Sequence, residues 1–203
     1  MSTAQEDFWR GDFGNSYISR NNDKELLASK SAMFTKILSK TNNLNSVVEF
    51  GCNIGLNLLA LKNLLPYTKL TGIEINHKAA NEAKKMEIAE IHEQSIFEFS
   101  SSNTFDLTFT SGVLIHINPS RLYEVYEKLY EFSKKYIVIA EYYNPSPVTV
   151  EYRNHQDVLF KRDFASELMA KYKDLVLLNY GFVYHKDATF PLDDITWFLF
   201  EKK

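Results

Sequence analysis

The stretch VVEFGCNIGLNLLALKNLL, residues 47–65, decides the fold. Its first residues belong to the apolar run NSVVEF at 45–50, which is typical of a strand buried on both faces. Gly51 and Gly55 follow this strand, where they allow a tight turn and a close approach of the backbone to a ligand. A helical pattern then runs to Pro66, and the free amides at its start favour a carboxylate or phosphate. The stretch predicts a strand, a glycine loop and a helix that together bind a ligand.

Outward from this unit, short apolar runs keep alternating with helical patterns. Further strands are expected at 69–75, 89–96, 105–114 and 136–143, with helices at 77–86 and 120–133 between them. An irregular stretch, a helix at 161–173 and two closing strands at 174–185 and 194–202 complete the chain. The order predicts an α/β fold with a doubly wound, seven-stranded, mostly parallel sheet and an antiparallel C-terminal hairpin. Such a sheet binds ligands beyond the carboxyl ends of its strands.

Composition narrows the class of protein further. A chain of 203 residues fits a single domain, 1–203, with 45% hydrophobic residues and a net charge of −3. The chain has no dense Lys/Arg run, which argues against a nucleic-acid partner. Cys52 is the single cysteine, so no internal disulfide or cysteine-cluster zinc site is expected. We also expect no membrane span, no export signal, no metal dependence, a cytoplasmic location, and a monomer or homodimer.

Acidic and polar residues follow the strands at the expected binding edge. Glu74 ends the second strand, where a carboxylate can accept both hydroxyls of a ribose. A dinucleotide fingerprint would require glycine at positions 53 and 56, which are Asn53 and Leu56 here. This difference argues against a nicotinamide or flavin enzyme.

The loop pattern E-F-G-C-N-x-G at 49–55 resembles the S-adenosylmethionine (SAM) loop of the class I methyltransferases, whose fold is Rossmann-like. The resemblance implies a SAM cofactor, with Glu49 near its methionine end, Glu74 on the ribose and Ile75 on the adenine. It also implies that Tyr17 and Arg20 reach the carboxylate of the cofactor. The remaining cofactor-binding residues implied by the resemblance are Gly51, Asn53, Gly55, Gln94, Ser95, Ile96, Thr110 and Gly112.

The fourth strand leads into S-G-V-L-I-H-I at 111–117. An N/D-P-P-Y/F motif, typical of enzymes that methylate amino groups of nucleic-acid bases, is missing there, and the pattern resembles the branch that acts on small molecules. His116 can take a proton from an acceptor hydroxyl, because its ordinary pKa is near neutrality. It can equally pack over the pocket and fix the loop. His155 is a second candidate base.

Four segments, at 8–21, 141–147, 151–155 and 159–164, resemble methylases associated with pseudaminic acid biosynthesis, a nonulosonic sugar pathway of bacterial surface glycans. The resemblance implies a sugar or sugar-nucleotide acceptor. Aromatic faces and charged groups in a substrate-facing insertion at 142–165 agree with a hydroxylated ligand. The residues expected to contact the acceptor are Trp9, Glu141, Tyr142, Tyr143, Arg153 and Arg162. Another small acceptor (an amine, a carboxylate or a natural-product phenol) and a non-catalytic SAM-binding regulator remain open alternatives.

Residues 1–40 precede the first core strand and are expected to form a lid or a helical arm. The segment 8–21 carries Trp9, Phe13 and Tyr17, with Gly11 and Gly14 as candidate hinges. A lid would close over bound cofactor, whereas an arm would pack permanently on the sheet.

Overall fold

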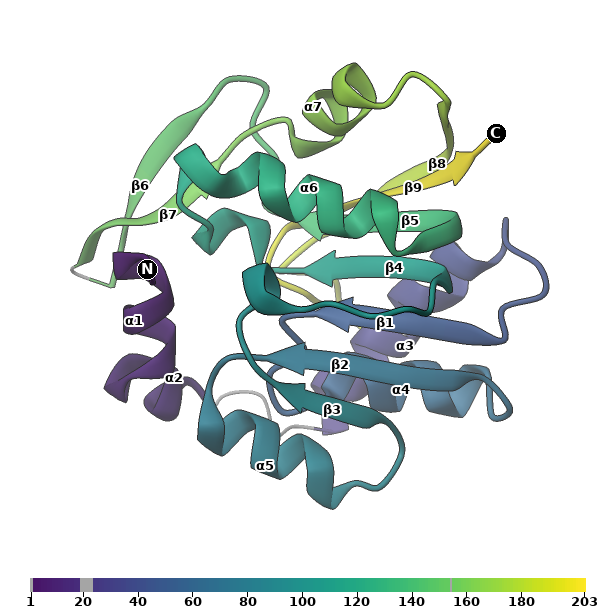
Figure 1. Cartoon of the computed structure of the whole chain (residues 1–203), viewed down its shortest axis with the longest axis horizontal. Coiled ribbons are helices and arrows are strands. Elements are labelled where there is room, and N and C mark those ends of the chain that lie inside the picture. Colours follow the sequence, from purple (N-terminus) through teal and green to yellow (C-terminus); the bar gives the residue numbers. More distant parts are fainter. Residues whose placement is uncertain (1, 19–23, 154) are drawn as a thin grey trace.

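The computed structural model describes residues 2–18, 24–153 and 155–203. Its main sheet has seven strands in the order β3-β2-β1-β4-β5-β9-β8 (Figure 1). The neighbouring pairs β3–β2, β2–β1, β1–β4 and β4–β5 are parallel, while β9 is antiparallel to both β5 and β8. The predicted α/β architecture with an antiparallel C-terminal hairpin is confirmed. The strands are β1 (Ser46–Phe50), β2 (Lys69–Glu74), β3 (Glu90–Glu93), β4 (Phe105–Ser111), β5 (Ser133–Glu141), β8 (Leu175–Val183) and β9 (Ile195–Lys202).

Helices bury both faces of the sheet, because successive strand residues point to opposite sides. Val47 packs into a core cluster with residues of α3 (Lys24–Leu38) and α4 (Leu56–Leu64). Its neighbour Val48 packs into the other cluster, with residues of α6 (Leu122–Glu131) and α7 (Phe164–Lys171). Full burial of one such valine stabilises the fold by roughly 1.5–3 kcal/mol. Near-continuous apolar strands are therefore what a two-sided parallel sheet requires.

The order of the strands changes direction between β1 and β4, and this point positions the site. From β1 the chain steps outward through β2 to β3, and then returns to the other side of β1 to form β4. The loops that follow β1 and β4 therefore diverge and leave a crevice at the carboxyl ends of the strands. Helix α5 (His77–Lys85) follows β2, and its first turn lies at the same edge of the sheet (Figure 1).

The irregular stretch expected after β5 is instead a hairpin. β6 (Val148–Tyr152) and β7 (His155–Lys161) form a separate two-stranded antiparallel sheet. The β-branched run at 148–150 favours an extended backbone, and Arg153 adopts a left-handed φ of 53° at the turn. Three of the expected parallel strands also end early: the third at Glu93, the fourth at Ser111, where Gly112 turns with a φ of 69°, and the fifth at Glu141. These turns are set by local backbone conformation, which apolar runs do not reveal.

The N-terminal region is helical. α1 (Ala4–Arg10) starts with a capping box, in which the Glu6 amide donates to Thr3 Oγ1 at 3.2 Å and the Thr3 amide donates to Glu6 Oε2 at 2.8 Å. α2 (Asp12–Tyr17) follows directly. Both helices lie beyond the carboxyl ends of the central strands, beside the β6–β7 hairpin (Figure 1). They stand where a segment covering the crevice is expected.

Candidate functional site

A cavity of about 500 Å³ opens at the carboxyl ends of the strands. This volume is within the range of small-molecule sites, roughly 300–1,000 Å³. Of the residues predicted from the sequence, the cavity is lined by Trp9, Tyr17, Gly51, Asn53, Glu74, Ile75, Ser95, Ile96, Gly112, His116, Tyr142 and Arg153. Those outside the lining are Glu49, Gly55, Gln94, Thr110, Glu141, Tyr143, His155 and Arg162. Arg20 lies outside the described residues.

The glycine loop between β1 and α4 forms one wall. Gly51 has a φ of 79°, and a Cβ there would lie 2.5 Å from Val113 Cγ2, so the turn has no room for a side chain. Gly55 has a φ of 82° and caps α4. Asn53 is also left-handed, with a φ of 49°, and its Oδ1 accepts from the Ile54 amide at 2.7 Å. The loop conformation thus exposes backbone to the cavity.

Glu74 connects this loop to the end of β2. Its Oε2 accepts from the Asn53 amide and its Oε1 from the Asn76 amide, both at 2.7 Å. Burial raises the pKa of this carboxyl above its ordinary value. An ionised carboxylate offers about four acceptor positions, so the Glu74 carboxylate can still accept a hydrogen bond from a ligand. Next to it, the Gln94 amide donates to the Glu74 carbonyl at 3.0 Å, which holds β3 against β2.

A polar chain that sequence reasoning missed lies behind the glycine loop. Glu49 is fully buried, and its Oε1 accepts from Asn57 Nδ2 at 2.5 Å. Asn57 Oδ1 in turn accepts from Lys30 Nζ at 2.7 Å. Burial raises the pKa of Glu49 to about 8 and lowers that of Lys30. Lys30 and Asn57 line the cavity, whereas Glu49 does not.

Glu141, expected to contact the acceptor, is used inside the fold. Its Oε1 accepts from the Val113 amide at 3.0 Å and from the Leu114 amide at 3.1 Å. The side chain is buried, and burial raises its pKa to about 7. The carboxyl of β5 therefore holds the turn that follows β4, and this turn carries Gly112 and His116 to the cavity. Thr110, at the end of β4, is likewise buried and away from the lining.

His116 is held in one tautomer by the hairpin. Its Nδ1 lies 2.7 Å from the Val158 carbonyl oxygen, which can only accept, so Nδ1 carries the proton and Nε2 is the unprotonated nitrogen. Burial lowers the pKa of the imidazole to about 4, so the ring is neutral near pH 7. The Trp9 and Tyr152 rings pack against it, with centroids at 4.6 and 5.5 Å.

Some of the predicted residues in and around the hairpin line the cavity, and others lie outside it. Tyr142 lines the cavity, while the adjacent Tyr143 is 42% exposed and lies outside the lining. Arg162 pairs with Glu167, with Nε 3.0 Å from Oε1. His155 is exposed, and its ring packs against Phe8 of α1, with centroids 4.9 Å apart. Tyr143 and Arg162, predicted to contact the acceptor, and His155, predicted as a candidate base, therefore lie outside the lining of this cavity.

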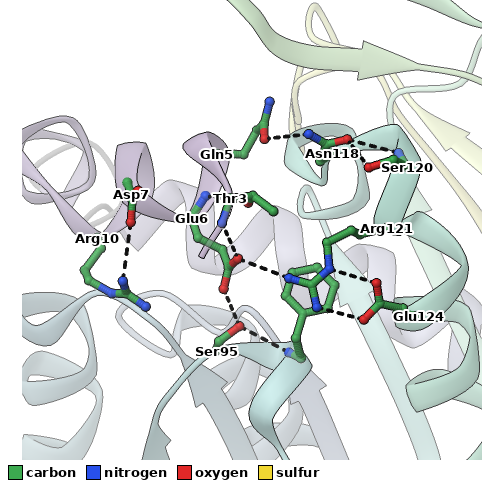
Figure 2. Close-up of polar contacts among 11 residues, drawn as sticks. Thr3, Gln5, Glu6, Asp7, Arg10, Ser95, Asn118, Ser120, Arg121 and Glu124 are labelled. Atoms are coloured by element: carbon green, nitrogen blue, oxygen red, sulfur yellow. Dashed lines mark hydrogen bonds and ion pairs between the residues drawn. The ribbon is translucent and has the colours of Figure 1, made fainter. Parts of the chain in front are cut away.

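The N-terminal helices cross the opening of the crevice. Glu6 of α1 accepts from Ser95 Oγ at 2.6 Å, and Arg121 Nη1 lies 3.5 Å from the other carboxylate oxygen of Glu6. Figure 2 shows how these side chains lie. The same helix reaches the loop after β4, where Asn118 Nδ2 donates to Gln5 Oε1 at 3.1 Å (Figure 2). The helices α1 and α2 thus form a strap that joins the β3 side to the β4 side.

Comparisons with known proteins agree with the enzyme class that the sequence predicts. Residues 47–135 match the family model described as a methyltransferase domain. The part of the chain from β1 to the start of β5 is thus similar to a methyltransferase domain. No curated protein sequence matches it. The enzyme class expected from the sequence is therefore confirmed, and the strand order is that of the class I methyltransferase fold.

Solved structures share this fold over 90–100% of the chain. Magnesium protoporphyrin IX methyltransferase from Synechocystis PCC 6803 with bound SAM has a TM-score of 0.72 at 10% identity, covering 100% of this chain and 99% of that one. The plantazolicin methyltransferase BpumL in complex with S-adenosylhomocysteine (SAH) has a TM-score of 0.68 at 18% identity, with 98% and 94% covered. N-methyltransferase NodS from Bradyrhizobium japonicum WM9 has a TM-score of 0.67 at 15% identity, with 90% and 98% covered. At these identities the likeness shows the fold alone.

The cavity also has features that fit a nucleoside cofactor. Ile75 and Ile96 provide apolar surface beside the Glu74 carboxylate. A Cβ at Gly112 would meet no atom within 4 Å, so the backbone there is open to the cavity. The loop between β8 and β9 adds Pro191, Leu192 and Asp193 to the lining, which sequence reasoning did not predict.

Two properties of the described residues concern metal and membrane partners. No group of three or more His, Cys, Asp or Glu side chains is arranged to hold a metal ion in residues 2–18, 24–153 and 155–203. None of the helices in the same part of the chain combines the length and apolar character that a bilayer crossing requires.

Proposed function

We propose that the chain transfers a methyl group from SAM to a small hydroxylated or amino acceptor, and that this acceptor is a sugar or sugar nucleotide of nonulosonic acid biosynthesis for bacterial surface glycans. One observation carries the proposal: a single cavity is lined both by the Gly51 loop with Glu74 and by Tyr142, Tyr152 and Arg153. The resemblance of four segments to methylases of this pathway supports the acceptor class.

The cofactor half would be bound by residues of β1, β2 and the loop after β3. SAM, when bound, supplies an electrophilic methyl carbon on a positively charged sulfur. Glu74 would accept the ribose hydroxyls, and Ile75 and Ile96 would pack on the adenine. Trp9 of the strap would exclude water from the reacting atoms, which strengthens every polar contact inside the cavity.

The acceptor half would be bound by the hairpin side of the cavity. Tyr142 and Tyr152 offer ring faces to the apolar faces of a sugar, and the Arg153 guanidinium offers several donors for hydroxyl, carboxylate or phosphate oxygens. His116 Nε2 would accept a hydrogen bond from the attacking hydroxyl or amine. Rate acceleration then comes mainly from holding nucleophile, carbon and sulfur in line.

The low pKa of His116 favours a second candidate acceptor class. An imidazole with a pKa of about 4 is a weak base for a sugar hydroxyl, because proton transfer is most efficient when the base titrates near the working pH. An amine, a carboxylate or a phenol needs a weaker base than a sugar hydroxyl does, because each of them is nucleophilic or gives up its proton more easily than an alcohol. Acceptors of these kinds are therefore the alternative, together with a regulator that binds SAM without catalysis.

Transfer of a radiolabelled methyl group from SAM to a panel of sugar nucleotides, free acidic sugars, amines and phenols tests the proposal. The expected result is turnover of a sugar or sugar nucleotide. Tyr142→Ala should raise the acceptor KM and leave SAH affinity within about threefold, whereas Tyr143→Ala, outside the cavity, is the matched control. Turnover of amines or phenols alone would select the second class, and SAH binding without any turnover would indicate a regulator.

A further inference from the structure

Lys30 is a cation in the cavity for which the proposed function so far has no use. It lies on α3, partly buried, and its side chain lines the cavity. Its ammonium has three N–H donors, and Asn57 Oδ1 takes one of them at 2.7 Å. Among the described residues, no carboxylate oxygen lies within 4.0 Å of Lys30 Nζ. A charge held in this way has donors to offer an anion.

Two acidic groups act on Lys30 from a greater distance. Glu49 attracts it from behind Asn57, and Asp193 attracts it from the loop between β8 and β9. Glu49 does not line the cavity, and its Oε2 is buried with no hydrogen-bond partner among the described residues. The Asn57 amide therefore separates the buried acid from the cavity. Asn57 thus places the ammonium of Lys30, and not the carboxyl of Glu49, at the cavity.

The start of α4 adds to the positive field at this place. Asn57 belongs to the first turn of this nine-residue helix, and Gly55 caps the helix without a side-chain hydrogen bond. The first amides of a helix and its dipole both favour a negative group. Lys30 and the helix start thus point to the same chemistry, which is a carboxylate.

We propose that Lys30 binds the carboxylate of the amino-acid portion of SAM, that Asn57 positions its ammonium, and that Glu49 acts through Asn57 without touching the cofactor. The proposal rests on SAM being the cofactor, as in the proposed function. It gives to Lys30 the carboxylate that the family resemblance assigned to Tyr17 and Arg20, and it keeps Glu49 near the methionine end of the cofactor but behind Asn57. Lys30 is then a binding residue, while Asn57 and Glu49 are positioning residues.

Calorimetry measures the binding of two ligands to Lys30 variants. It thereby distinguishes the loss of one contact to the carboxylate from a general loss of structure in the variant. SAH carries the amino-acid carboxylate, and 5′-methylthioadenosine lacks it. Lys30→Met should weaken SAH binding roughly 10- to 100-fold, the loss expected for one hydrogen bond between charged groups, and leave 5′-methylthioadenosine within about threefold. Lys30→Arg should recover part of the SAH affinity. Equal weakening of both ligands, or of neither, would overturn the role of Lys30.

Variants of Glu49 test the indirect arrangement. Glu49→Gln keeps an oxygen for Asn57 Nδ2, so SAH affinity should remain within about threefold of wild type. Glu49→Leu removes that anchor and should weaken SAH but not 5′-methylthioadenosine. A loss of about tenfold or more in Glu49→Gln would show a direct contact with the cofactor and overturn the positioning role.

A third ligand distinguishes whether Lys30 binds the carboxylate of the cofactor or the carboxylate of an acidic acceptor. The ligand is N-acetylneuraminate, an acidic nonulosonic sugar, and its binding to SAH-saturated protein is measured for wild type and Lys30→Met. The refuting result is that Lys30→Met no longer binds this sugar but binds SAH as tightly as wild type does. That result would assign Lys30 to the acceptor and overturn the cofactor assignment. Wild-type protein that binds neither nucleoside would overturn the proposed function together with this inference. Equal SAH affinity of wild type and Lys30→Met would overturn this inference and leave the proposed function standing.

Discussion

Replacement of Glu141 should reveal a structural role rather than a role in acceptor binding. Its Oε1 accepts two backbone amides, those of Val113 and Leu114. Each hydrogen bond to the neutral carboxyl contributes about 0.5–1.5 kcal/mol, and a buried donor left unpaired costs about 1–3 kcal/mol. Glu141→Ala should therefore lower the free energy of unfolding by about 2–5 kcal/mol. For a domain of this size, the Tm should fall by roughly 5–15 °C.

The pH dependence of stability supplies a second test at the same residue. Burial raises the pKa of Glu141 from 4.5 to about 7, so the folded protein holds a proton that the unfolded chain releases within this window. The contribution of the group is thus favourable at low pH and is lost as pH rises from 4.5 through 7. The loss amounts to about 3 kcal/mol, at about 1.4 kcal/mol for each pH unit between the two pKa values.

Glu141→Gln keeps an oxygen for both amides and removes the ionisation. Its Tm should be close to that of wild type at pH 5 and should exceed it by roughly 6–12 °C at pH 8. Differential scanning calorimetry of wild type and both variants across this pH range measures the effect, and the difference between curves cancels the titration of other groups. An unchanged Tm in Glu141→Ala, or a Tm difference for Glu141→Gln that does not vary with pH, would refute the reasoning.

Three other predictions concern the cofactor, the strap and metal. Glu74→Ala should weaken SAH binding by about 1–3 kcal/mol in calorimetry, since it removes the acceptor for the ribose, and wild-type affinity would contradict that role. Hydrogen exchange in residues 4–17 should slow when SAM binds if the strap is a lid, whereas equal protection with and without SAM would identify a fixed arm. Dialysis against EDTA should leave methyl transfer unchanged, and recovery of lost activity by magnesium would show a metal requirement.

The parallel core could be predicted because its signals are local. The apolar run around Val47 and Val48 and the glycine turn after it occur within a few residues, and two-sided burial requires such a pattern. Glu74 could be placed for the same reason, since it ends a recognisable strand. Whether Tyr142 or Tyr143 faces the cavity could not be predicted, because β5 ends two residues earlier than expected and the facing depends on that end.

Lys30 was missed although the sequence carries a signal for it. On α3, Lys30 is spaced by three or four residues from Leu26, Met33 and Phe34, so it lies on the apolar stripe of the helix. A lysine on such a stripe is more unusual than one on the solvated face. The hairpin β6–β7 had no comparable signal, because it pairs only with itself and its turn lacks the Asn-Gly or Asp-Gly pair typical of two-residue turns.

The contact between His116 and the β6–β7 hairpin uses the main chain of Val158, and this has a consequence for acceptor range. Every amino acid has a backbone carbonyl, so the side chain at position 158 can change without releasing the imidazole. The hairpin also forms its own two-stranded sheet, apart from the seven-stranded one. Hairpins of different sequence can therefore be grafted between β5 and α7 while the histidine tautomer and the Gly51 and Glu74 side of the cavity are retained. Under the proposed function, in which the hairpin side binds the acceptor, exchange of this one segment is a route to new acceptors.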